Sequence, residues 1–66
     1  MNVFMYEDVI INLEAVEYIT TSMPDNRRKT QTVTFHLRND KWTIINLPIS
    51  EVQKTLKEIY NQMKGE

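Results

Sequence analysis

Cysteine is absent from this chain of 66 residues, glycine occurs once and proline twice. Without cysteine, neither a disulfide nor a thiolate metal site can stabilise the fold. The one glycine, Gly65, leaves no glycine-rich phosphate loop, and so little glycine and proline excludes a linker. A domain this short buries only about 60% of the surface that its unfolded chain exposes. We therefore expect one domain, residues 1–66, that gains stability by associating with another chain.

A long hydrophobic run and an excess of charge of either sign are also missing. Eight Lys and Arg residues stand against nine Asp and Glu residues, which gives a formal net charge of −1. This balance provides no strong field toward nucleic acid or an anionic membrane. The longest uncharged stretch, residues 42–50, is far shorter than the ~18 apolar residues of a membrane span, and the first residues lack the basic start of a signal peptide. We expect a cytoplasmic protein that does not contact a membrane.

Five segments rich in β-branched and aromatic residues have the pattern of β-strands. They are residues 2–6, 9–13, 16–22, 31–38 and 42–47. Alternation is clearest in the fourth segment, where Val33, Phe35 and Leu37 interleave with polar residues, as in a strand with one buried face. Turn-forming residues separate the segments: Glu7 and Asp8, an Asx turn at Asn12, an exposed loop of about eight residues around Pro24, and Asn39 to Lys41.

The last segment, about residues 50–64, has the pattern of an amphipathic helix. Ser50 and Gln53 match a capping box, in which the side chain of each residue accepts a hydrogen bond from the backbone amide of the other. One apolar stripe recurs with helical spacing at Val52, Leu56, Ile59 and Met63. The predicted fold class is therefore α+β: a small antiparallel β-meander of four to five strands, followed by one C-terminal helix packed on the sheet.

The segment Ile11-Asn12-Leu13-Glu14-Ala15-Val16-Glu17-Tyr18-Ile19, with the strand from Thr32 to Leu37 and the terminal helix, resembles a group of short bacterial and phage proteins. Those proteins combine a β-meander with one helix, and most have no assigned function. The chain is more weakly similar to the flagellar FlbD-like family. It departs from that family by lacking glycine-containing hairpin turns and by inserting the loop from Pro24 to Lys29. The resemblance implies a phage or mobile-element origin and assigns no functional residue.

Residues that could carry catalysis are few and isolated. His36 is the only histidine, and the alternation places it on the polar face of its strand without a second histidine or a cysteine as a metal partner. Ser50 has a ready role as a helix cap, and a chain this short leaves little volume for a cleft. We expect no enzyme activity, no cofactor and no metal.

Apolar side chains outnumber those that one helix stripe can cover. In the last strand, Trp42 and Ile44 lie on one face, whereas Ile45 and Leu47 lie on the other. Loops could cover the surplus within one chain, but extended apolar patches mark contact surfaces, and Trp and Tyr are frequent anchors. We expect Tyr18, Trp42, Ile44 and Ile45 to form an interface, most simply of a homodimer joined face to face or by edge strands.

The function that fits best is a small non-catalytic protein-interaction module that self-associates. An alternative is a nucleic-acid-binding or regulatory protein that uses the basic loop residues Arg27, Arg28 and Lys29. Arg38 and Lys41, with Trp42, could extend that cluster, although a net charge of −1 argues against nucleic acid. A second alternative is a small inhibitor of another protein.

Overall fold

The computed structural model describes residues 2–64 and contains five strands and one α-helix. The elements, in chain order, are β1 (Val3–Tyr6), β2 (Val9–Asn12), the 3-10 turn η1 (Leu13–Ala15), β3 (Val16–Thr21), β4 (Thr30–Leu37), the 3-10 turn η2 (Arg38–Asp40), β5 (Trp42–Pro48) and α1 (Ile49–Met63). Every strand and the helix lie within one residue of the ranges that the sequence pattern predicts. The predicted α+β fold is confirmed.

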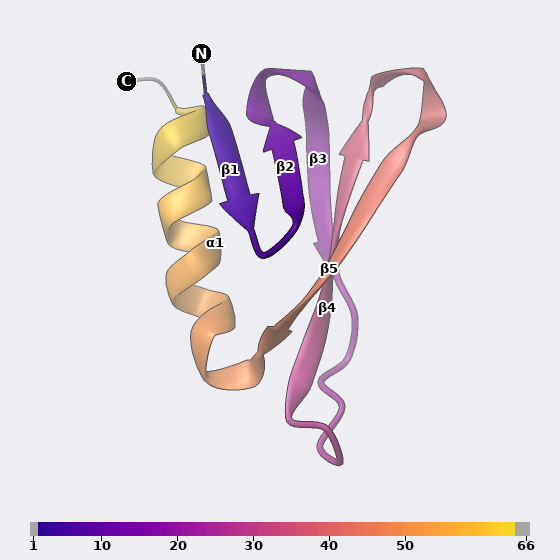
Figure 1. The fold of residues 1–66 in the computed structure, drawn as a ribbon, viewed down its shortest axis with the longest axis vertical. Coiled ribbons are helices and arrows are strands. Elements are labelled where there is room, and N and C mark those ends of the chain that lie inside the picture. Colours follow the sequence, from indigo (N-terminus) through magenta and orange to yellow (C-terminus); the bar gives the residue numbers. More distant parts are fainter. Residues whose placement is uncertain (1, 65–66) are drawn as a thin grey trace.

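The five strands form two antiparallel sheets (Figure 1). β1 and β2 make a hairpin, and β3, β4 and β5 make a three-stranded sheet with β4 in the centre. The break between the sheets lies at Asn12, whose side-chain oxygen accepts a 3.0 Å hydrogen bond from the amide of Glu14. This is the predicted Asx turn. It starts η1 and carries Leu13 into the core, so that β3 begins a new sheet.

A core of nine apolar residues joins the two sheets to the helix. Each is less than a tenth exposed: Ile11, Leu13, Val16, Val33, Phe35, Ile45, Leu47, Val52 and Ile59. Val33 and Phe35 are fully buried at the centre of β4, and the Phe4 ring of the hairpin stacks on Phe35 at 5.9 Å between centroids. The hairpin and α1 therefore cover the same face of the three-stranded sheet, here called the inner face (Figure 1).

The helix begins one residue earlier than the capping box predicts. Pro48 is its N-cap residue, and no side chain caps this end. The amide of Ile49 donates instead to the carbonyl of Lys29 at 2.9 Å, which ties the first turn to the loop before β4. Ser50 consequently lies inside the first turn, and the predicted capping role of Ser50 and Gln53 is wrong.

The apolar stripe of α1 faces the sheet as predicted over most of its length. Val52 and Ile59 are buried and Leu56 is half-buried, whereas Met63 is 37% exposed near the end of the helix. At the same end, the Asn2 side chain donates to the carbonyl of Gln62 at 3.0 Å, which fixes the start of β1 beside the helix. Within residues 2–64, no helix has both the length and the apolar character needed to cross a membrane.

Truncating the centre of the core should unfold most of the protein. We expect Phe35→Ala to cost about 3–5 kcal/mol, because it removes a fully buried ring and its contact with Phe4. A domain of this length has only about 3–10 kcal/mol of stability in total. Urea unfolding followed by circular dichroism measures the loss. Met23→Ala is the control, because Met23 is 87% exposed and should change stability by less than about 0.5 kcal/mol.

The two predicted caps should respond differently to truncation. Asn12→Ala should lower the free energy of unfolding by about 0.5–2 kcal/mol, because it removes a bond to a backbone amide. Ser50→Ala should lower it by less than about 0.5 kcal/mol, because this hydroxyl caps nothing. The same urea experiment compares the two variants. A larger loss for Ser50→Ala than for Asn12→Ala would contradict the position of the helix start.

Candidate functional site

The face of the three-stranded sheet that points away from the core, here called the outer face, carries three aromatic rings on adjacent strands. His36 of β4 pairs with Tyr18 of β3 on one side and with Trp42 of β5 on the other. Directly opposed residues on adjacent strands point to the same face, so the three rings form one row across the sheet. We call Tyr18, His36 and Trp42 the aromatic row.

The aromatic row is held in place by contacts among its own side chains. The Tyr18 and His36 rings stack with centroids 4.2 Å apart and planes inclined by 9°. His36 Nε2 lies 2.9 Å from the hydroxyl oxygen of Thr20, the next outward residue of β3. These contacts fix the orientation of the imidazole and of the Tyr18 ring that stacks on it.

Apolar surface on the outer face continues beyond the row. In the next register position, Thr34 of β4 pairs with Ile44 of β5, beside Trp42 on the same face. Trp42 is 64% exposed, Tyr18 55% and Ile44 50%. Polar residues complete the face, and the Thr32 hydroxyl donates to the side-chain oxygen of Asn46 at 2.8 Å. The outer face thus has an exposed apolar end, and the rest of the face is mainly polar.

The structure brings together three of the four predicted interface residues. Tyr18, Trp42 and Ile44 share the outer face, whereas Ile45 is 4% exposed and belongs to the core. Ile45 is wrong as an interface residue because it points to the inner face, which the helix and the hairpin already cover. His36 lies on the polar face of its strand, as the alternation predicts, and it is the central ring of the row. The pairing of β3 with β4, which sequence periodicity does not define, produces this contact.

A shallow hollow of about 300 Å³ lies along the aromatic row. Besides the three rings and Leu37, its lining residues are charged: Glu17, Asp40 and Lys41. Both signs of charge therefore border the exposed rings. Among residues 2–64, no group of three or more His, Asp or Glu side chains is arranged to hold a metal ion.

The basic loop lies at the opposite end of the sheet from the aromatic row. Arg27, Arg28 and Lys29 precede β4, whereas Arg38 and Lys41 follow it (Figure 1). The eight residues of β4 separate the two groups by about 24 Å of extended chain. Arg38 and Lys41, with Trp42, therefore do not extend the basic cluster, and that expectation is wrong.

The basic loop has a defined local structure. Asp25 pairs with Thr30 through two backbone hydrogen bonds of 2.8 and 3.2 Å, which close the loop. The carboxylate of Asp25 accepts hydrogen bonds from the amides of Arg27 at 3.0 Å and Arg28 at 3.3 Å. An acidic group thus sits at the centre of the cluster and offsets part of its positive charge.

No family model, curated protein or solved structure matches this chain. The resemblance to the FlbD-like proteins stays a prediction.

Proposed function

We propose that this chain is a small, non-catalytic interaction module that associates with a second copy of itself through the outer face of its three-stranded sheet. The observation that carries the proposal is the exposure of Tyr18, Trp42 and Ile44 on one sheet face, around the His36 ring of the central strand. Contiguous apolar surface of this kind is typical of a contact site, and burying one such side chain contributes about 1.5–3 kcal/mol. Aromatic side chains in such a position are the usual anchors of an interface.

The charges of the outer face favour a second copy as the partner. A two-fold axis brings identical surfaces together, so a self-associating face must not place like charges against each other. Glu17, near the start of β3, is the one Lys, Arg, Asp or Glu residue in the three strands, and it borders the aromatic row together with Asp40 and Lys41, so the border carries charges of both signs. Asp40 of one copy can therefore approach Lys41 of the other. The net charge of −1 adds little repulsion between copies.

The size of the outer face indicates a weak dimer. Three strands about 4.8 Å apart and about 24 Å long present a face of roughly 350 Å². A stable interface buries about 800 Å² on each partner, so the face and its border together reach only the range of transient complexes. We accordingly expect a monomer in dilute solution and a dimer at higher concentration.

The two alternative functions lack a comparable observation. Sequence-independent binding of single-stranded nucleic acid combines aromatic platforms with a basic groove along the backbone. Here the aromatic row and the basic loop of Arg27 to Lys29 lie at opposite ends of β4. An inhibitor of another protein would need a feature that fits one partner, and the exposed apolar residues elsewhere, such as the Met5–Ile10 pair of the hairpin, indicate no particular partner.

Light scattering over a concentration series tests the self-association. The mass should rise from about 7.9 kDa toward twice that value, and Trp42→Ala should shift the midpoint to at least about tenfold higher concentration. Tyr60→Ala is the matched control, because Tyr60 is an aromatic residue 62% exposed on α1, away from this face. A wild-type monomer at every concentration, or an unchanged midpoint in Trp42→Ala, would contradict the proposal.

A further inference from the structure

Helix α1 carries a second exposed stripe beside the one that packs on the core. Gln53, Lys57, Tyr60 and Lys64 follow at spacings of four, three and four residues, so they lie on one flank of the helix. Each is one residue further along than a member of the core stripe, and all four are exposed. We call these four residues the basic flank.

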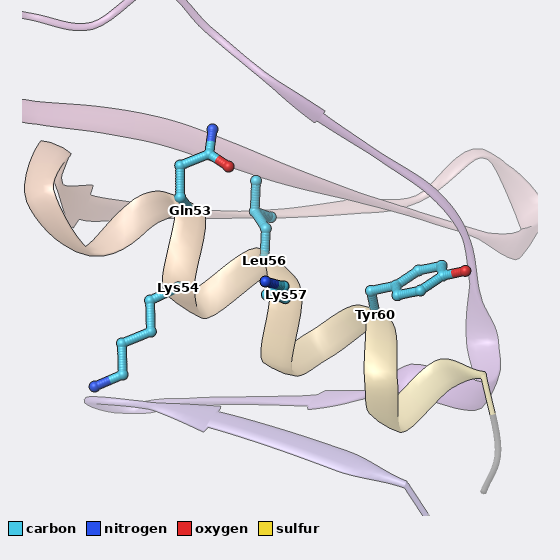
Figure 2. Close-up of a pocket in the computed structure, with 5 residues that line it drawn as sticks. All are labelled: Gln53, Lys54, Leu56, Lys57 and Tyr60. Carbon is cyan, nitrogen blue, oxygen red and sulfur yellow. The ribbon is translucent and has the colours of Figure 1, made fainter.

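A shallow groove runs along the basic flank. Its volume is about 580 Å³, and its lining residues are Gln53, Lys54, Leu56, Lys57 and Tyr60. Figure 2 shows Gln53, Leu56 and Tyr60 projecting to one side of the helix axis and Lys54 to the other. The half-buried Leu56 and the exposed Tyr60 ring provide apolar surface within the groove. Farther along, the ammonium group of Lys64 lies 5.7 Å from the centre of the Tyr60 ring.

The positive charge of the basic flank is not balanced within the helix. Side chains three or four residues apart on a helix are neighbours, and Glu51 and Glu58 have this spacing to Lys54. Glu51 and Glu58 are therefore placed to offset the charge of Lys54. Lys57 and Lys64, by contrast, have no acidic neighbour at either spacing.

We propose that the basic flank binds an acidic segment of a protein partner. An aliphatic or aromatic side chain of the segment packs on Leu56 and Tyr60, and its carboxylates pair with Lys57 and Lys64. Two uncompensated lysines fall short of the six to ten phosphate contacts typical of nucleic-acid binding, whereas they suit a short peptide with an apolar anchor. Charge complementarity and the mixed lining of the groove thus favour an acidic peptide.

This surface is independent of the proposed dimer. The basic flank belongs to the helix that covers the inner face, whereas the dimer uses the outer face of the same sheet. One copy can therefore contact a second copy and an acidic segment at the same time. A dimer would present two such grooves, which raises the effective affinity for a partner with two acidic segments.

Selection from a library of random twelve-residue peptides tests the inference. The intact chain should enrich peptides that combine several Asp or Glu residues with one aromatic or aliphatic residue. A peptide selected in this way, titrated into ¹⁵N-labelled protein, should shift the amide signals of residues 53–64, and its affinity should fall as salt is raised. Enrichment of peptides that lack acidic residues would overturn the proposal, as would amide signal shifts confined to elements other than α1.

Charge reversal supplies the matched control. Lys57→Glu combined with Lys64→Glu should lower the affinity for the selected peptide at least about tenfold, since attraction becomes repulsion at two positions. Arg27→Glu combined with Arg28→Glu changes the net charge of the protein by the same amount, but on the basic loop. This variant should weaken peptide binding less than about threefold. Equal losses in the two variants would overturn the proposal, as would tighter binding of a twelve-nucleotide single strand to the basic flank. The double variant Lys57→Glu with Lys64→Glu should keep the light-scattering mass of the wild type. Its loss of peptide binding can then be told apart from a loss of dimerisation.

Discussion

The buried side chains at the centre of β4 hold the rest of this small protein together. Phe35 and Val33 are fully buried, with Phe4 of the hairpin stacked against one side and the core stripe of α1 against the other. Alternate residues of a strand point to opposite faces. Because Val33 and Phe35 point inward, Thr34 and His36 point outward. Covering the inner face takes both the hairpin and the helix. None of the described elements packs on the outer face, and Tyr18, Trp42 and Ile44 are therefore exposed there.

Local patterns in the sequence predict most of this architecture. The alternation around Phe35 and the helical spacing from Val52 depend on which residues are apolar, and so they identify the elements directly. The Asx turn at Asn12 is equally local and is found where expected. The division into two sheets is less local, since it depends on how η1 packs in the core. The helix start likewise depends on a bond from Ile49 to Lys29, two residues that are far apart in the sequence.

The candidate site shows the same limit. Alternation places Trp42 and Ile44 on the same face of their strand, but the position of His36 between two rings follows from the register of β4 with both neighbours. An apolar residue count alone does not tell Ile44 from Ile45, which point in opposite directions. The basic residues show the opposite case. Composition groups the basic loop with Arg38 and Lys41, but the length of β4 separates them. Long-range pairing therefore decides which side chains share a surface.

The structure leaves two separate surfaces with different chemistry. The outer face carries exposed aromatic and apolar side chains at one end, with charges of both signs at its border, and the basic flank of α1 combines apolar and positive groups. They lie on opposite sides of the three-stranded sheet, so a contact on one does not obstruct the other. An arrangement of this kind suits a small adaptor that joins copies of itself to an acidic partner, with specificity determined by side-chain chemistry rather than by a deep pocket.

The central claim is that the outer face becomes buried between two copies, and the fluorescence of Trp42 tests it most directly. Trp42 is the only tryptophan and is 64% exposed in the monomer, so its emission reports on this face alone. As concentration rises, we predict a shift of the emission to shorter wavelength and at least about a twofold fall in quenching by acrylamide. Unchanged emission and quenching, while light scattering shows the mass doubling, would place the interface elsewhere and contradict the account.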